Sequence, residues 1–321
     1  MAVALSEAEL LGLADALADG AWHSGEDLAA RAGITRAALA KRIDRLREWQ
    51  LDVETRHGLG YRLSAPLERL DEKQLRERLT PPLRVQVLTV TDSTNTQLLA
   101  ADATQDPQAM LAEFQTGGRG RRGRAWVSPF GANLYFSLAW SFAAWPRDLS
   151  ALPLAVGVAL ARTLHATGAQ VGVKWPNDLW IAGRKLGGIL IEHRGEAGGP
   201  CRAVIGVGLN LSMTAAQAQA VDQPWIALEQ ALDRRLPRNE LAGRILAALH
   251  ESLAQFERSG FASFVADWNR FDLTAGKTVR VERDPPVTGI ARGIDASGAL
   301  LVEVGGQRHA IHSGEVSLRL A

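Results

Sequence analysis

The sequence predicts an α+β multidomain protein, with a helical module first, a mixed α/β domain in the middle and β-hairpins at the end. Three observations support this prediction. Apolar residues within positions 1–66 recur at helical spacing before a hairpin signal, the middle of the chain alternates strand-like and helix-like runs, and residues 277–304 hold three short strand-like runs. With 321 residues, 46% of them hydrophobic, the chain is long enough for two or three domains with substantial cores.

The first module has the pattern of a winged helix-turn-helix. Its helices are defined by regularly spaced apolar residues, namely Leu10, Leu13, Leu17, Leu39, Ile43 and Leu46. Ser24 and Asp27 give a capping-box signal, and Thr35 caps the helix that follows a glycine-containing turn. Short strands near 51–55 and 61–63, joined by a second glycine-containing turn, predict the wing.

Charge is unevenly distributed in this module. Residues 1–30 contain six acidic residues and no lysine or arginine, whereas residues 31–47 contain six basic residues and one acidic residue. We therefore expect the second helix of the motif to enter a major groove, where it contacts DNA through Arg36, Lys41, Arg42 and Arg45. The module as a whole remains acidic, so one copy should bind weakly and a pair on a twofold-symmetric site more strongly. A module used only for packing or regulation is the alternative.

A linker joins this module to the middle of the chain. A charged helix is expected over residues 71–79, ended by Pro81 and Pro82. A strand over 85–90 then delivers the segment Asp92-Ser93-Thr94-Asn95 to the start of a helix. Side chains of this kind either cap the helix or hydrogen-bond a ligand.

The stretch from Gly117 to Trp140 carries the strongest chemical signal. It begins GGRGRRGR, so four arginines and four glycines share eight positions. Guanidinium groups this close repel one another unless an anion lies among them, and glycine lets the backbone approach a ligand closely. We therefore expect a loop that binds a polyanion, with a solvated basic turn as the alternative.

Known nucleotide-binding motifs fit this chain poorly. The loop glycines match G-x-G-x-x-G, but a strand-like run over 134–140 follows where a dinucleotide-binding fold has a helix. A kinase glycine-rich loop is disfavoured because no VAIK-type lysine strand or HRD loop follows. Gly276-Lys277-Thr278 resembles the end of a P-loop, but Phe271 stands where that motif requires glycine.

Polar residues also follow or enter three later strand-like runs. A helix over 148–167 precedes a strand over 171–175 that leads into Lys174-Trp175-Pro176-Asn177-Asp178. Arg184 and Lys185 enter an apolar strand whose paired glycines indicate close approach by another group. A further buried strand over 204–211 carries Asn210 at its end.

The last part of the sequence predicts helices and then hairpins. Helices are expected over 241–256 and 261–268, followed by strands over 277–282, 287–294 and 300–304. His309 and His312 have no third ligand nearby in the sequence, so no metal site is expected.

Composition also indicates the cellular compartment in which the protein is expected. The single cysteine, Cys201, excludes a disulfide framework within one chain and fits a reducing environment. The N-terminus lacks the basic region of a signal peptide, and the longest apolar run, 151–161, is too short to span a bilayer. We expect a cytoplasmic protein with no membrane partner. Its net charge is only +1, so any affinity for DNA must come from local asymmetry.

Four motifs together carry a resemblance to a known family. GRGRRGRAWVSPFGANLYFS, KWPNDL, RKLGGILIE and VIGVGLNL, in this order and spacing, closely resemble the bacterial biotin–protein ligases. With the helix-turn-helix, the whole chain is similar to the ligases that also repress biotin synthesis genes. The resemblance implies a winged helix-turn-helix domain (1–66), a mixed α/β catalytic domain like that of class II aminoacyl-tRNA synthetases (67–272) and an SH3-like C-terminal barrel (273–321).

The resemblance also implies an activity and partners. Such ligases use ATP, with Mg²⁺, to convert biotin to biotinyl-5′-AMP, and then transfer biotin to a lysine of a biotin carboxyl carrier protein. Operator DNA and a homodimer formed in the adenylate-bound state are the other implied partners. Both reactants of the first step are anions, so cations are needed between them.

Site roles follow from the resemblance by position. Residues matching those that bind the ureido group of biotin and neighbouring atoms are Ser93, Thr94, Asn95 and Gln115. Arg119-Gly120-Arg121 matches the loop that closes over biotin and the adenylate, and Arg124 is a further available cation. The implied catalytic residues are Arg121, Lys174, Asp178 and Lys185. Asn177 would help to orient phosphates and Mg²⁺, and Trp126 and Asn210 would contact the nucleotide, although packing and strand capping explain the last two nearly as well.

Two alternatives from other functional classes remain. A lipoate or octanoate transferase of related fold is disfavoured, because the arginine-rich motif and the DNA module fit biotin better. A ligand-sensing transcription factor without catalysis is disfavoured because Lys174, Asp178 and Lys185 are all present.

Overall fold

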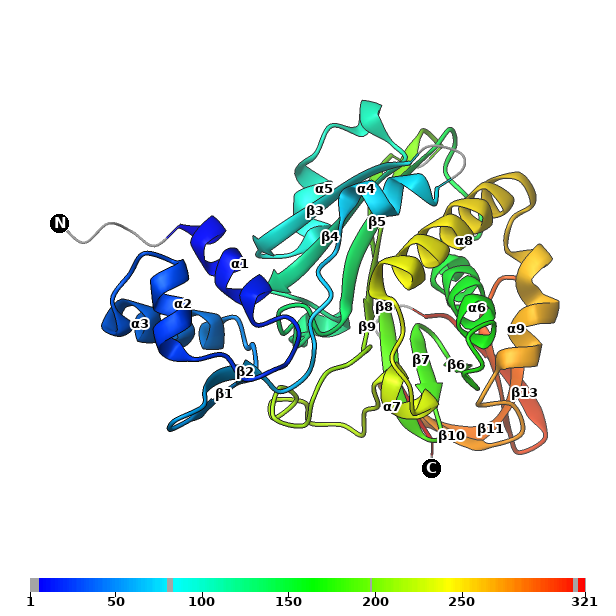
Figure 1. Cartoon of the computed structure of the whole chain (residues 1–321). Coiled ribbons are helices and arrows are strands. Elements are labelled where there is room, and N and C mark those ends of the chain that lie inside the picture. The colour runs from blue at the N-terminus through cyan, green and yellow to red at the C-terminus, as the bar shows by residue number, and fades with distance from the viewer. Residues whose placement is uncertain (1–5, 80–82, 197, 314–316, 321) are drawn as a thin grey trace.

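The computed structural model describes residues 6–79, 83–196, 198–313 and 317–320. A helical module lies at one end of the molecule, a seven-stranded mixed sheet with its helices forms the middle, and a small antiparallel sheet lies at the other end (Figure 1). The break predicted at Pro81 and Pro82 falls outside the described residues.

The N-terminal module is a winged helix-turn-helix. Its elements are α1 (Glu7–Ala16), α2 (Gly25–Arg31), α3 (Arg36–Glu48), β1 (Val53–Arg56) and β2 (Gly60–Leu63). The six apolar residues predicted to face inward are buried. Ser24 caps α2 by accepting from the backbone N–H groups of Glu26 and Asp27, whereas the complete capping box lies on α1, between Ser6 and Glu9.

The central sheet has the strand order β3-β4-β5-β9-β8-β7-β6. β3 and β4 are parallel and the other neighbours are antiparallel. The strands are β3 (Arg84–Thr91), β4 (Gln108–Gln115), β5 (Leu134–Phe142), β6 (Gly172–Lys174), β7 (Asp178–Ile181), β8 (Arg184–Gly195) and β9 (Cys201–Leu209). The strand β7 was not predicted from the sequence.

Helices cover both faces of this sheet. The larger core packs α6 (Leu152–His165), α8 (Arg238–Ser259) and α9 (Val265–Phe271) on one face, with Phe136 and Leu138 of β5 pointing into it. On the opposite face, Leu98 of α5 (Thr94–Ala100) packs against Ala139 of β5. Because β5 is buried on both faces, its sequence is almost continuously apolar, and Ser137 is a buried polar exception.

Shorter helices complete the central part. They are α4 (Glu72–Glu77), α7 (Leu228–Leu232) and the 3-10 turns at Ala103–Gln105, Arg121–Gly123, Leu149–Ala151 and Phe261–Phe264. The helix predicted over 148–167 is thus a 3-10 turn followed by α6. No helix within the described ranges is both long and apolar enough to cross a membrane.

The C-terminal sheet is antiparallel, with the strand order β13-β12-β11-β10-β14. The three predicted strands correspond to β10 (Thr278–Glu282), β11 (Val287–Ile294) and β12 (Leu300–Val304), and β13 (Gln307–Ile311) and β14 (Ser317–Leu320) complete the sheet. Its apolar residues join the core of the central domain, and Trp175 Nε1 donates to Gly298 O in the β11–β12 turn at 3.2 Å. This sheet is therefore fixed against the central domain.

The helical module shares a core with the central domain. Trp49, at the end of α3, stacks on Phe130 with ring centroids 5.1 Å apart and an interplanar angle of 10°. Phe130 N–H donates to Trp49 O at 3.0 Å, and Phe114 of β4 belongs to the same apolar cluster. This contact joins the end of α3 to the segment that follows the arginine-rich loop.

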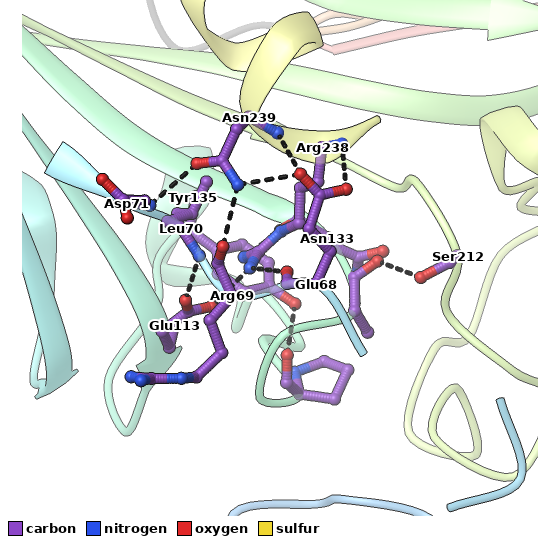
Figure 2. Close-up of polar contacts among 12 residues, drawn as sticks. Glu68, Arg69, Leu70, Asp71, Glu113, Asn133, Tyr135, Ser212, Arg238 and Asn239 are labelled. Carbon is purple, nitrogen blue, oxygen red and sulfur yellow. Dashed lines mark hydrogen bonds and ion pairs between the residues drawn. The ribbon is translucent and has the colours of Figure 1, made fainter. Parts of the chain in front are cut away.

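The linker between the two parts is held by a buried polar cluster that we call the linker clamp, formed by Glu68, Glu113, Asn133, Arg238 and Asn239 (Figure 2). The Arg238 guanidinium donates to Asn133 O, Glu68 O and the Glu113 carboxylate. Burial alone would raise the pKa of Glu68, but hydrogen bonds from the backbone of Arg238 and from Asn239 outweigh it and lower that pKa. The clamp fixes the point at which the chain leaves the winged helix-turn-helix module.

Candidate active site

The predicted ureido-binding residues meet where β3 and β4 end. Thr91 and Gln115 are paired in the parallel register, and α5 begins directly after β3. Gln115 Oε1 accepts from the Thr94 backbone N–H at 3.0 Å. Ser93 occupies the N-cap position of α5, but its side chain makes no capping bond there. The Ser93 hydroxyl therefore does not cap α5, which leaves the ligand-binding role as the prediction for this side chain.

The arginine loop, Gly117–Trp126, is a narrow hairpin-like excursion from the end of β4. Trp126 N–H donates to Gly118 O at 2.8 Å and Gly120 N–H donates to Arg124 O at 2.7 Å. At its tip Arg122 and Gly123 both have positive φ. A Cβ on Gly118 would lie 2.7 Å from Trp126 O and 2.8 Å from Ser128 Oγ, so glycine is required for this close packing.

Two arginines of the loop reach across to other elements. Arg121 Nη2 donates to Ser313 O of the C-terminal part at 2.6 Å, and Nη1 donates to Asn177 Oδ1 at 3.4 Å. Burial lowers the pKa of Arg121, and the nearby Asp178 carboxylate opposes that shift. Arg119 Nη2 donates to Thr96 Oγ1 at 3.1 Å, whereas Arg124 is exposed.

The remaining predicted catalytic residues share one face of the sheet. Lys174 pairs with Asp178 across β6 and β7, and Asp178 pairs with Gly188 across β7 and β8. Directly paired residues project to the same side. Lys185 Nζ lies 2.9 Å from Asp178 Oδ1, and Lys174 Nζ lies 4.3 Å from the centre of the Trp180 ring. Three cations therefore lie around Asp178: Arg121, Lys174 and Lys185.

Trp126 lies over glycines of β8 and β9. A Cβ on Gly208 would be 2.4 Å from its indole ring, and a Cβ on Gly188 would be 3.5 Å away. Lys185 Nζ is 5.6 Å from the ring centre. The indole Nε1 is buried and lacks a hydrogen-bond partner among the residues that the structure describes. A buried N–H group without a partner can donate a hydrogen bond to an acceptor on a bound ligand.

Both predicted asparagines bond to the backbone. Asn177 Nδ2 donates to Ile189 O at 2.8 Å, and Asn210 Nδ2 is 3.4 Å from both Lys185 O and Ile226 O. These contacts tie both asparagines to the backbone of β8, and Asn210 also to the segment at Ile226. A nucleotide contact by Asn210 stays a prediction, beside a structural role that the geometry already explains.

Two residues without an assigned role also belong to this site. Ser137 Oγ is 2.7 Å from Thr94 Oγ1, and Glu192 Oε2 accepts from Asn95 Nδ2 at 2.7 Å and lies 3.7 Å from Arg119 Nη2. A serine within the apolar run of β5 was the available signal for Ser137. Glu192 ends one of the family motifs, but the sequence does not show that it turns toward Asn95.

The charged residues fit a magnesium ion carried by a nucleotide. Among the described residues, no group of three or more His, Cys, Asp or Glu side chains could hold a metal. Asp178 supplies one carboxylate, and Mg²⁺ with nucleotides commonly takes one or two carboxylates together with phosphate oxygens.

The residues predicted to contact DNA differ in their exposure to solvent. Arg36, Lys41 and Arg45 are exposed on α3. Arg42 is buried and forms an ion pair with Glu9 of α1, so it holds two helices together and does not face a groove. Arg45 pairs with Glu48 on the same helix.

The fold and the site define a class of protein in which a winged helix-turn-helix is joined to a mixed α/β domain with a cationic ligand site. Family models match three segments: "HTH domain" over residues 17–62, "Biotin/lipoate A/B protein ligase family" over 87–210 and "Biotin protein ligase C terminal domain" over 274–319.

Relatives extend the match to nearly the whole chain. The bifunctional ligase/repressor BirA of Salmonella typhimurium is 42% identical over 314 residues, covering 97% of this chain and 98% of the relative. A biotin–[acetyl-CoA-carboxylase] ligase of Mycobacterium tuberculosis is 35% identical, covering 77% and 95%. The biotin protein ligase of Aquifex aeolicus, solved with biotin and ATP, has a TM-score of 0.65 at 27% identity, covering 74% and 99%. The chain belongs to the biotin–protein ligase family, within its bifunctional ligase/repressor group.

Proposed function

We propose that this protein is a cytoplasmic, ATP-dependent biotin–protein ligase that also acts as an adenylate-dependent repressor of biotin synthesis genes. The observation that carries the ligase proposal is the cluster of Arg121, Lys174 and Lys185 around Asp178, beside the glycines of β8 and β9. The similarity to the Aquifex aeolicus ligase solved with biotin and ATP supports it.

The cation cluster suits a reaction between two anions. In the first step a biotin carboxylate oxygen attacks the α-phosphorus of ATP, and the bond to pyrophosphate breaks. Lys185 would neutralise the attacking carboxylate, and Lys174 and Arg121 would neutralise the phosphates. Bound Mg²⁺ would supply further positive charge at the phosphates, with Asp178 and Asn177 as its nearest protein oxygens. No covalent intermediate with the enzyme is needed.

The second step transfers the acyl group to the carrier protein. The lysine amine attacks the acyl carbon, AMP leaves and the amine loses a proton. We assign Asp178 to position that lysine. The arginine loop would exclude water from the mixed anhydride until the carrier arrives. Through the loop's contact with Ser313, which follows β13, the C-terminal part of the chain would take part in that closure.

Pyrophosphate exchange tests the ligase proposal. Purified protein with ATP and Mg²⁺ should exchange labelled pyrophosphate when biotin is added, and should then label a biotin carboxyl carrier protein on lysine. Exchange with lipoate in place of biotin would favour the related transferase. Exchange with neither acid, together with DNA binding that responds to biotin, would identify a ligand sensor without catalysis.

The repressor proposal rests on two features. The Trp49–Phe130 stack joins the recognition helix to the segment that follows the arginine loop. In addition, β7 pairs with β8 only over Arg184–Gly188 within the described strands, which leaves the far half of β8 as an edge. We propose that this edge takes either a second copy of the chain or the carrier protein. Dimerisation would then place two weak DNA modules on one operator.

A gel-shift titration tests this coupling. Operator affinity should rise when biotin and ATP are both present, and DNA binding indifferent to them would refute the coupling. In Trp49→Ala or Phe130→Ala, the stack is lost and the rise should shrink while pyrophosphate exchange continues. A full response to ligand in both variants would exclude the stack as the connection.

A further inference from the structure

A chain of hydrogen bonds runs along the ureido-binding residues from β4 to β8. It passes from Gln115 through Thr94, Ser137 and Asn95 to Glu192. Ser137 is fully buried, and Thr94 and Asn95 are each only 4% exposed. Buried hydroxyl and amide groups have few partners, so each proton in this chain can be assigned.

The Asn95 amide has one possible orientation. One of its terminal atoms lies 2.7 Å from Glu192 Oε2 and 3.4 Å from Leu190 O. The backbone carbonyl of Leu190 can only accept, so the atom that faces it is Nδ2. Asn95 Oδ1 therefore faces Ser137 Oγ, at 2.5 Å. Because an amide oxygen cannot donate, the proton on this contact belongs to Ser137.

This assignment also fixes the Thr94 hydroxyl. Thr94 Oγ1 lies 2.7 Å from Ser137 Oγ, and one hydroxyl must donate across that contact. The Ser137 proton is engaged with Asn95, so Thr94 donates to Ser137, and Gln115 Oε1 is a second and longer acceptor at 3.3 Å. A hydroxyl carries one proton. Toward a ligand, Thr94 can therefore offer only lone pairs.

The neighbouring amide has the opposite polarity. Gln115 Oε1 accepts from Thr94 N–H, so its Nε2 is the group that donates to Ser128 Oγ, at 3.1 Å. An amide nitrogen carries a second N–H, which suits a ligand carbonyl. The site thus pairs an acceptor at Thr94 with a donor at Gln115.

Gly206 of β9 gives independent support for the position of Asn95. A Cβ built on Gly206 would lie 2.3 Å from Asn95 Oδ1. Only glycine lets the amide lie against the strand between Ser137 and Glu192.

We propose that Glu192 and Ser137 are positioning residues that hold the Thr94 hydroxyl as a hydrogen-bond acceptor, so that the site selects a ligand with an N–H group beside a carbonyl. The inference rests on the proposed function, because the cyclic urea of biotin has this pattern and the dithiolane ring of lipoate does not. A site that hydrogen-bonds a substrate group can reject an analogue lacking it by roughly 10⁴-fold.

The test measures kcat/KM for pyrophosphate exchange with biotin and with two cyclic carbamates, in each of which oxygen replaces one ureido N–H. In one of these carbamates the ring oxygen would face the Thr94 hydroxyl. The wild type should prefer biotin over that carbamate by at least about 100-fold, because two hydrogen-bond acceptors would then face each other. In Glu192→Gln, the new amide can donate to Asn95, and Asn95 can turn over. Ser137 then accepts from Asn95, and Thr94 can donate to the carbamate oxygen.

We expect that preference to fall at least about tenfold in Glu192→Gln and in Ser137→Ala, which releases the Thr94 hydroxyl. Glu192→Asp keeps a carboxylate and should retain most of the wild-type preference for biotin over the carbamate. The matched control is Glu303→Gln, an acid paired with Arg292 in the C-terminal sheet, which should keep the wild-type preference. A preference within about twofold of wild type in both test variants would overturn the proposal and leave biotin activation standing. No biotin-dependent exchange by the wild type would instead overturn the proposed function.

Discussion

The linker clamp and the arginine loop use arginine in opposite ways. In the clamp, Arg238 is 3% exposed, and its guanidinium nitrogens donate to Glu68, Glu113 and Asn133. In the loop, Arg121 lies beside Arg122 and near the Asp178 carboxylate, which Lys185 also contacts and which Lys174 faces across the strand pair β6–β7. The clamp has a matched acceptor for its cation, whereas the site gathers cations around one anion.

The difference separates structural from functional charge. A buried guanidinium with matched carboxylates fixes one geometry, and removing one partner leaves an uncompensated charge. Several cations gathered near one carboxylate can also form charge-assisted hydrogen bonds with an anionic ligand. Variants in the linker clamp should therefore lower stability, whereas variants in the cationic site should lower catalytic activity.

The largest effect is expected in the clamp. Arg238→Ala leaves Glu113 buried without its cation and should lower the free energy of unfolding by about 3–5 kcal/mol, measured by urea denaturation. The control is Arg235→Ala, which removes an exposed arginine whose Nη2 donates to Pro66 O at 2.7 Å. That variant should lose at most about 1 kcal/mol. Equal losses in the two variants would contradict the role assigned to the clamp.

A smaller effect, confined to chemistry, is expected at the site. Lys185→Met removes the charge beside Asp178 and should lower kcat for pyrophosphate exchange about 10²–10³-fold. Its melting temperature should stay close to wild type. Arg184→Met, one residue earlier on β8, is the matched control and should change kcat little. A normal rate in Lys185→Met would remove this lysine from the mechanism.

The arginine loop should show its role in retention of the adenylate. Arg121→Ala loses the contacts with Ser313 and Asn177, and we expect labelled adenylate to leave the enzyme about 10-fold faster, in keeping with the roughly 1.5–3 kcal/mol of a charged hydrogen bond. Arg122→Ala changes an exposed neighbour at the loop tip and serves as the control. Release at the wild-type rate from Arg121→Ala would show that the loop does not retain the intermediate.

The smallest effect is expected on the DNA face. Lys41→Ala removes one exposed cation of α3, and the slope of log affinity against log salt should fall by about 0.9. Arg47→Ala is the control, because Arg47 already bonds Asp44, Val53 O and Thr55 within the module. An unchanged slope for Lys41→Ala would place α3 away from the phosphates.

Local patterns predicted much of the fold. The helix-turn-helix, the strand over 134–140 and the hairpins over 277–304 follow from spacing and turn residues, and the structure has all of them. The strands β7, β13 and β14 were missed. β7 has only four residues, and β13 is polar and mostly exposed, so neither has an apolar alternation of its own.

The motifs contain the cations that the structure brings together, but the sequence did not predict the contacts between elements. Motif residues such as Arg121, Lys174 and Lys185 lie together around Asp178. Arg42, expected to face DNA, is instead buried against Glu9, because its place on the inner side of α3 depends on a contact 33 residues away. The roles of Ser137 and Glu192 depend likewise on contacts with Thr94 and Asn95 that only the folded sheet creates.

The most direct test of the cationic site is calorimetric titration of the purified wild-type protein with biotin and with a non-hydrolysable analogue of biotinyl-5′-AMP. If Arg121, Lys174 and Lys185 receive the carboxylate and the phosphate, both ligands bind, and Lys185→Met weakens both. Binding of neither ligand to the wild-type protein would contradict the account.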